Sequence, residues 1–217
     1  RRREQNWYTL LPPGLSVVPE AIDAATGVMI TPWVEGQLLT EAWTDLQPEH
    51  LLHYVSNQHR QLPDPGRDYQ VGEIYRLQNT PRSISANNGP LIAPPVPTPE
   101  HLRQPCHNDL NPWNVLITPQ GWITLDWEFV GNNDPLFDLV NLHQGLELPL
   151  AELPELTVAY LDRMDAPPAT PERLHHVIYS FWYRELRWAQ RQLSQGNDRP
   201  EIQDQVVLAT QRLSLLR

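Results

Sequence analysis

The pattern of hydrophobic and polar positions predicts strands early in the chain, a hairpin in its middle and helices in its second half. Residues 16–36 alternate in the manner of strand, turn and strand, with Ala25-Thr26-Gly27 at the turn. Residues 48–62 place apolar side chains at helical spacing behind a proline in the first turn. Strands followed by helices indicate an α+β chain.

The middle and the end of the chain show equally clear patterns. "VLIT", a "PQG" turn and "WITLDW" predict two antiparallel strands over residues 115–127. The next helix is predicted to have Asp134 as its N-cap and Pro135 as its first residue. A long irregular connection is predicted for residues 81–105, which contain seven prolines. Further helices are predicted at roughly 150–164, 170–195 and 200–216.

The motif "HNDLNPWN" gathers polar side chains immediately before the predicted hairpin. Asp109 and Asn114 lie five residues apart in the loop, and the hairpin brings Asp126 back alongside Asn114. A carboxylate and an amide oxygen placed in this way suit a hard divalent cation such as Mg²⁺. Asp109 can then orient an attacking hydroxyl and accept its proton. Phosphoryl transfer needs these parts: metal ligands, a base and a positioned nucleophile.

Together, "HNDLNPWN", the hairpin and "LDWEFVGNNDPLFDL" resemble the aminoglycoside phosphotransferase, choline kinase and thiamine kinase superfamily over residues 106–142. The resemblance implies a protein-kinase-like α+β fold, with ATP as co-substrate and Mg²⁺. It divides the chain into residues 1–36, the remainder of an N-terminal nucleotide-binding lobe and hinge, and residues 37–217, a mostly helical C-terminal lobe with the catalytic hairpin. The first three strands of the N-terminal lobe are expected to be missing.

The resemblance also implies roles for individual residues. Asp109 corresponds to the catalytic base, and His107 to the residue that braces the catalytic loop. The remaining assignments are Asn111 in the catalytic loop, Asn114, Asp126 and Glu128 toward the metal, Thr31, Pro32, Trp33 and Val34 in the nucleotide-binding hinge, and Asp138 and Glu4 as structural support.

The long helix predicted at residues 170–195 is the candidate for acceptor binding. Glu185 falls near the centre of its apolar face, with Trp182 at the border and Trp188 on the face. A carboxylate among aromatic rings favours a cation opposite, because indole faces attract positive charge. The alternative is that Glu185 pairs with Arg184 or Arg103 while the tryptophans fill the core. Trp113, in the catalytic loop, is a second aromatic candidate, and its alternative is packing over that loop.

Composition narrows the class of partner. The chain of 217 residues has a net charge of −10, which argues against nucleic-acid binding. A single cysteine excludes an intrachain disulfide, and no leader or membrane span is visible, so we expect a cytoplasmic location and no membrane partner. All sixteen basic residues are arginine. The chain therefore lacks the phosphate-contacting lysine of the family, for which an arginine stands in some relatives.

The sequence therefore predicts an ATP-dependent small-molecule kinase. Its expected reaction transfers the γ-phosphate to a hydroxyl of a small cationic metabolite, choline- or thiamine-like. One alternative is an aminoglycoside phosphotransferase. Another is a catalytically inactive pseudokinase that binds a metabolite, which the absent lysine and glycine-rich loop favour and the intact Asp109, Asn114 and Asp126 oppose.

Overall fold

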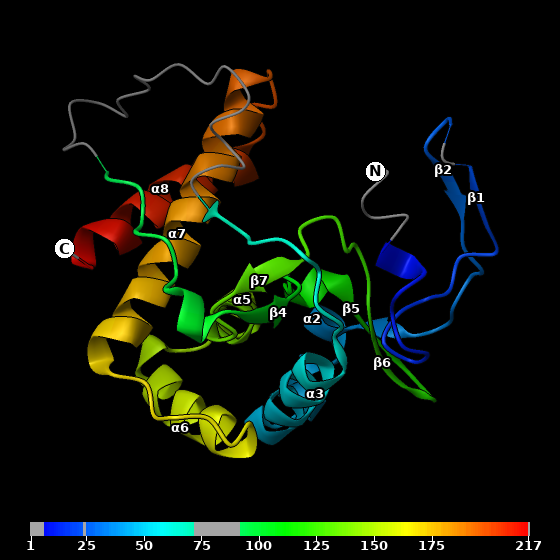
Figure 1. The fold of residues 1–217 in the computed structure, drawn as a ribbon. Helices are drawn as coiled ribbons and strands as arrows, with labels where there is room; N and C mark the ends of the chain where they lie inside the picture. Colours follow the sequence, from blue (N-terminus) through cyan, green and yellow to red (C-terminus); the bar gives the residue numbers. More distant parts are fainter. Residues whose placement is uncertain (1–6, 24, 72–91, 217) are drawn as a thin grey trace. The chain divides into compact units, whose positions relative to one another are not determined.

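The chain folds into two compact units in a computed structural model that describes residues 7–23, 25–71 and 92–216 (Figure 1). The first unit holds the strands and the helices of the middle of the chain. The second unit holds the two long helices near the C-terminus. The expected division into lobes at residue 36 stays a prediction. The units comprise Arg1–Tyr69 with Pro99–Ala169, and Gln70–Thr98 with Thr170–Arg217.

An antiparallel strand pair forms where the alternating pattern predicted it. β1 (Ala21–Asp23) pairs with β2 (Val28–Ile30), with Ala21 opposite Ile30. The Asp23 carboxylate closes the turn by accepting hydrogen bonds from the backbone N–H groups of Ala25 and Thr26. The Thr26 hydroxyl also donates to this carboxylate at 2.6 Å. This hydroxyl bond first, and then the two backbone bonds, stabilise the charged carboxylate and lower the pKa of Asp23.

A second sheet has the strand order β3-β5-β6 and contains the predicted hairpin. β5 (Val115–Thr118) pairs with β6 (Gly121–Thr124), and β3 (Gln37–Leu38) pairs with the other edge of β5. The second hairpin strand ends at Thr124, earlier than the predicted residue 127. Asp126 therefore lies beyond the strand, because its backbone φ of 58° is incompatible with extended structure.

A third sheet joins the start of the polar motif to the segment that follows Asp126. β4 (Gln104–Cys106) runs antiparallel to β7 (Gly131–Asn133). The prediction of an irregular connection up to residue 105 is thus wrong at its end, since a 3₁₀ turn at Glu100–Leu102 and then β4 replace it. Residues 92–99 lack regular structure, as predicted, and residues 81–91 lie outside the described part.

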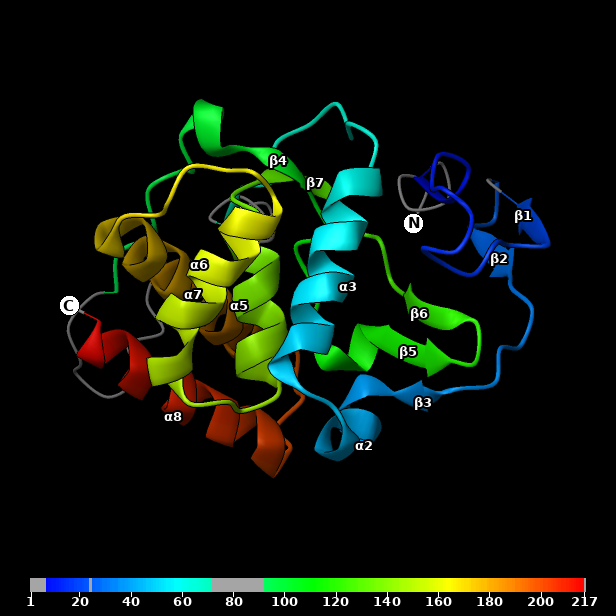
Figure 2. The same cartoon turned by 90° about the horizontal axis from the view of Figure 1, so that it is seen from below.

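Three helices pack together in the first unit: α3 (Pro48–Gln61), α5 (Leu136–Gly145) and α6 (Leu153–Arg163) (Figure 2). The start of α3 has the expected proline, and a reciprocal cap between Gln47 and His50. The N-cap of α5 is Pro135, one residue later than predicted. The Asp134 carboxylate nevertheless accepts the Leu136 N–H at 3.0 Å, the bond on which the prediction of a cap depended.

The second unit is built on α7 (Pro171–Ser194) and α8 (Pro200–Leu215), which pack against each other. The Thr170 hydroxyl caps α7 by accepting the Arg173 N–H at 3.2 Å. The predicted apolar face of α7 is buried at Leu174, Val177, Ile178 and Phe181. Among the described residues, no helix combines the length and the apolar character that crossing a membrane requires.

Candidate active site

The polar motif folds into a loop that is held by its own side chains. Asn108 has a left-handed backbone, with φ of 66°, which asparagine tolerates better than most residues. Its side-chain amide donates to the carbonyls of Cys106, Phe129 and Gly131 at 3.0–3.1 Å. Asn108 thereby ties the loop to the segment that follows Asp126, so the two halves of the motif form one structure.

Asp138 anchors the same loop from α5. Its carboxylate accepts the backbone N–H groups of His107 and Asn108, each at 2.8 Å, and lies 2.9 Å from Nε2 of His59. Burial alone would raise the pKa of Asp138, but the hydrogen bond and charge of His59 and the His107 N–H together lower it. His59 is held in turn by the Tyr160 hydroxyl at 2.6 Å. The loop thus depends on a buried carboxylate that stays ionised.

The Asp109 carboxylate is oriented by two amides of its own loop. The side-chain nitrogen of Asn114 donates to the Asp109 backbone carbonyl at 2.9 Å and to its carboxylate at 3.2 Å. The side-chain nitrogen of Asn111 donates to the other carboxylate oxygen at 3.3 Å. The Asn111 oxygen accepts the Trp113 N–H at 3.0 Å and so caps the 3₁₀ turn Pro112–Asn114. Asn111 therefore shapes the loop as well as contacting Asp109.

The hairpin bonds Asn114 to Leu125, the residue that precedes Asp126. The Leu125 N–H donates to the Asn114 carbonyl at 2.8 Å, which extends the pairing one residue beyond the two strands. His107 Nε2 lies 3.0 Å from the Leu125 carbonyl, and His107 Nδ1 accepts the Asp109 N–H at 3.2 Å. His107 thus bridges the loop of Asp109 and the segment of Asp126.

The donor set around Asp126 fits a hard cation. The Asp126 side chain is exposed, and its carboxylate has no hydrogen bond or ion pair with any described residue. The Asn114 side-chain nitrogen donates to Asp109, and its amide oxygen accepts no hydrogen bond from any described residue. One carboxylate and one amide oxygen are ligands that Mg²⁺ accepts, together with water and phosphate oxygens. Glu128, two residues on, is also exposed.

A second cluster with metal-binding side chains consists of His59, Cys106 and Asp138. His59 and Asp138 are hydrogen-bonded to each other, whereas the Cys106 thiol donates to the carbonyls of Gln104 and Asn133. The candidate ligand atoms of the cluster lie within 4.8 Å of one another, and all three of its residues are buried. Burial raises the pKa of the Cys106 thiol well above its usual value, so it stays protonated and a poor metal ligand. Both Asp138 oxygens already accept hydrogen bonds from the backbone of the polar loop. The cluster therefore serves the loop.

Comparison with known proteins independently supports the resemblance to the phosphotransferase superfamily. Residues 91–176 match the model of the phosphotransferase enzyme family (APH). That segment contains the polar loop, the hairpin and Asp138. The resemblance to the phosphotransferase superfamily is confirmed.

Individual proteins that resemble this chain in sequence or fold are also kinases or phosphotransferases by name, or are named LicA. Protein LicA of Haemophilus influenzae is 24% identical over 180 residues, which are 75% of this chain and 66% of LicA, just under two thirds of its length. Choline kinase LicA from Streptococcus pneumoniae superposes with a TM-score of 0.75 at 19% identity, over 99% of this chain and 80% of that one. A thermostable mutant of the aminoglycoside phosphotransferase APH(4)-Ia, solved with AMP-PNP and hygromycin B, gives a TM-score of 0.58 at 16% identity, over 99% and 81%. The protein-kinase-like fold of this superfamily is thus confirmed.

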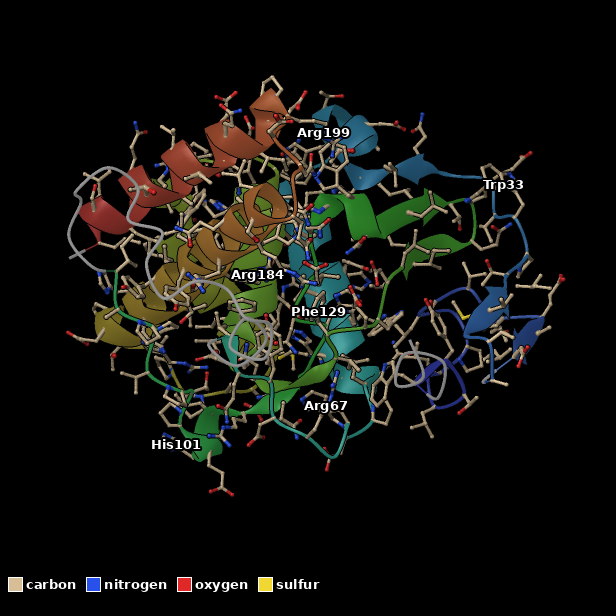
Figure 3. The ribbon with its side chains drawn as sticks, turned by 90° about the horizontal axis from the view of Figure 1, so that it is seen from above. Trp33, Arg67, His101, Phe129, Arg184 and Arg199 are labelled. Atoms are coloured by element: carbon tan, nitrogen blue, oxygen red, sulfur yellow. The ribbon has the colours of Figure 1, made fainter. Side chains whose placement is uncertain are left out.

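The predicted hinge lies between β2 and β3, away from regular structure. Residues 31–36 form no helix or strand, and Trp33 is 90% exposed (Figure 3). Gly36 lets this segment pass close to β5, since a Cβ there would lie 2.5 Å from the Ile117 carbonyl oxygen. Thr31, Pro32, Trp33 and Val34 keep their nucleotide-binding role as a prediction. Glu4 lies outside the described residues.

The acceptor candidates of α7 have partners inside the second unit. One Glu185 oxygen accepts from Nε and Nη2 of Arg184 at 3.0 and 2.6 Å, and the other accepts from Gln205 of α8 at 2.9 Å. Trp182 is buried, and the Arg212 guanidinium lies 5.7 Å from its ring centroid. These contacts correspond to the alternative in which Glu185 pairs with Arg184. Arg103, the other arginine of that alternative, is paired with Asp68 in the first unit.

The other two tryptophans are more open. Trp188 is 40% exposed, and Trp113 is 63% exposed beside Asn114 in the phosphotransferase loop. The role of Trp113, in the pocket or packed over its loop, stays a prediction. Sequence reasoning missed His59 and Asn108. The available signal for His59 was a histidine on the apolar face of the helix predicted at residues 48–62. For Asn108 there was no signal, because the sequence does not show that this side chain bonds three carbonyls.

Proposed function

We propose that this chain is an ATP-dependent small-molecule kinase that phosphorylates a hydroxyl of a small cationic, choline-like metabolite. The observation that supports the proposal is that Asn114 is bonded both to Asp109 and to Leu125, the neighbour of Asp126, within the segment that matches the phosphotransferase family model. Phosphoryl transfer is catalysed mainly by positioning and charge, and the side chains of Asp109, Asn114 and Asp126 can supply both.

Each residue has a defined part in the reaction. Asn114 and Asp126 would hold Mg²⁺, with Glu128 near the metal or the substrate, and the ion would neutralise charge on the nucleotide phosphates. The Asp109 carboxylate is held by Asn111 and Asn114. In this proposal it would orient the acceptor hydroxyl. The acceptor oxygen forms the new bond to the γ-phosphorus while the bond from that phosphorus to the β-phosphate bridging oxygen breaks. The hydroxyl proton passes to Asp109, and ADP leaves.

The acceptor class rests on the named relatives. The Streptococcus pneumoniae LicA is a choline kinase, and its fold is shared over nearly the whole of this chain. Choline is an alcohol with a quaternary nitrogen, and an exposed indole such as Trp113 suits a cation of that kind. Trp113 is therefore our main candidate for an acceptor contact. Glu185, Trp182 and Trp188 remain predicted acceptor contacts.

The test is an ATP-consumption assay of the protein with Mg²⁺ and a panel of acceptors: choline, ethanolamine, thiamine and an aminoglycoside. We expect the highest kcat/KM with choline or a close analogue, and no activity when Mg²⁺ is chelated. Preference for the aminoglycoside would contradict the choline-like acceptor but would still support the kinase activity. Nucleotide binding without turnover on any acceptor would support the pseudokinase alternative and overturn the proposal.

A further inference from the structure

A short segment between α3 and β4 borders the proposed metal-binding segment. We call residues 63–69 the strap. The Asn132 N–H donates to the Arg67 carbonyl at 2.7 Å, and the Tyr69 N–H donates to the Asn132 carbonyl at 2.9 Å. Asp68 and Asn132 form a parallel bridge. β4 pairs with one edge of β7. The strap therefore holds the backbone of β7 at its opposite edge.

Arg67 reaches from the strap toward Asp126. Its Nε donates to the Val130 carbonyl at 2.6 Å, and its Nη2 donates to the Glu128 carbonyl at 3.1 Å. These two carbonyls flank Phe129, near which Arg67 lies in Figure 3. The guanidinium is planar and carries its donors in a fixed fork, so one side chain sets the spacing of both carbonyls.

Two further features fix the position of the strap. The Asp64 carboxylate accepts the Gly66 N–H at 2.9 Å and the Asn132 side-chain amide at 3.0 Å. Gly131 allows the close approach, since a Cβ at that position would lie 3.1 Å from both Cβ and N of Tyr69. The strap is therefore held by several specific contacts against the segment that follows Asp126.

Asp126 depends on its neighbours for its position. Its left-handed backbone, with φ of 58°, is unfavourable for most residues, and its carboxylate has no partner among the described residues. On its upstream side, Leu125 is bonded to Asn114 and His107. On its downstream side, the Trp127 side chain is buried and the Glu128 carbonyl is held by Arg67.

We propose that Arg67 is a positioning residue that holds the turn bearing Asp126 and Glu128 in the geometry that Mg²⁺ requires. This inference rests on the proposed function. Arg67 acts through the backbone carbonyls of Glu128 and Val130. Partners that orient metal ligands in this indirect way typically contribute 10- to 100-fold to metal affinity or activity.

The test compares Arg67→Gln, Arg67→Lys and wild type in the full chain. Arg163→Gln is the matched control, because it removes an arginine whose ion pair is with Glu49, on α3. The Mg²⁺ concentration for half-maximal activity and the KM of the acceptor are measured with choline. Amide hydrogen exchange over residues 126–133 and the melting temperature are measured on the protein without metal.

We expect Arg67→Gln to raise the half-maximal Mg²⁺ concentration about tenfold or more and to leave the acceptor KM within about twofold. Exchange over residues 126–133 should accelerate in this variant and stay unchanged in the control. Arg67→Lys should recover only part of both effects, since an ammonium cannot reproduce the fork. Full recovery by lysine would show that charge alone matters and would overturn the proposal.

The exchange measurement separates this inference from the proposed function. If wild type transfers no phosphate to any acceptor, the proposed function fails, and local exchange in the Arg67 variants still decides whether Arg67 holds the segment. Unchanged exchange and unchanged Mg²⁺ dependence in Arg67→Gln would refute the positioning role. If Arg67→Gln does not fold, the same two readouts on Arg67→Lys decide.

Discussion

At the scale of single residues, the site uses side chains that satisfy backbone geometry and chemistry together. Asn108 and Asp126 both have left-handed backbones, and both belong to residue types that tolerate this conformation. The Asn108 side chain donates to three backbone carbonyls, whereas the Asp126 side chain is exposed. One of the two residues therefore shapes the site, and the other is available for binding.

Replacement of Asp126 tests the metal site. We expect Asp126→Asn to weaken Mg²⁺-dependent nucleotide binding and to abolish turnover, because a neutral amide is a poorer ligand for a hard cation than a carboxylate. Titration calorimetry with ATP, with and without Mg²⁺, measures the first effect and a coupled assay the second. Asp162→Asn, an exposed change on α6, is the control. Full activity of Asp126→Asn at ordinary Mg²⁺ would remove Asp126 from this role.

Replacement of Asp109 tests the chemical step. We expect Asp109→Asn to lower kcat by about 10²–10⁴-fold, the usual contribution of a general base. Nucleotide affinity should change little, since Asp109 acts on the acceptor hydroxyl. Steady-state kinetics together with a nucleotide-binding titration separate the two quantities. The assignment would be contradicted by a variant that binds nucleotide poorly yet keeps its kcat.

At the scale of elements, the hairpin and α5 position the site while α7 raises a separate question. The β5–β6 hairpin sets Leu125, the neighbour of Asp126, beside Asn114, and α5 supplies Asp138 beneath the loop backbone. α7 has its apolar face buried as predicted, yet Glu185 on it is bonded through both carboxylate oxygens. A cation that binds Glu185 must therefore compete with Arg184 and Gln205.

A single variant on α7 separates the two roles of Glu185. If Glu185 is a structural partner of Arg184 and Gln205, Glu185→Gln should lower the free energy of unfolding by about 1–3 kcal/mol, the scale of hydrogen bonds to a charged group. The KM values for ATP and for the acceptor should then change alike. Thermal melts and both KM values are measured, with the exposed change Glu201→Gln on α8 as control. A selective rise in the KM of the cationic acceptor, with an unchanged melting temperature, would instead place Glu185 in the acceptor site.

At the scale of the whole molecule, burial of titratable groups couples stability to pH. His143 of α5 is fully buried, and burial lowers its pKa from 6.5 to about 4. Its Nε2 lies 3.9 Å from a carboxylate oxygen of the half-exposed Glu152, which does not offset the desolvation. The folded protein thus keeps this imidazole neutral at pH values where the unfolded chain binds a proton.

The sign of this coupling follows from the two pKa values. Above about pH 6.5 both states are neutral at His143, and as the pH falls toward 4 the unfolded state is favoured, by up to about 3 kcal/mol. We expect His143→Gln to flatten the pH dependence of the free energy of unfolding in that range. Urea titrations at several pH values measure it, with the exposed His175→Gln as control. Equal slopes for His143→Gln and wild type would disprove the assignment.

Much of the fold and of the site could be predicted because the signals are local. Helical spacing predicted α3, α6, α7 and α8 to within a few residues, and alternation with turn residues predicted both hairpins. Two errors lay at boundaries, at Thr124 and Pro135, where side-chain bonds and backbone strain decide the last residue. A third was the strand β4, which was predicted as irregular because its partner β7 is distant in the sequence. The roles of the site residues stay predictions.

The sequence by itself determined the strand and helix pattern and the spacing of Asp109, Asn114 and Asp126, because hydrophobic periodicity and a tight hairpin act over short stretches of chain. Only the tertiary structure decided the partners of the site: His59 with Asp138 across 79 residues, Arg67 with Val130 across 63, and Glu185 with Gln205. A hydrogen bond needs a donor and an acceptor within about 3 Å in the right direction. Such a pairing between distant residues leaves no periodic trace in the sequence.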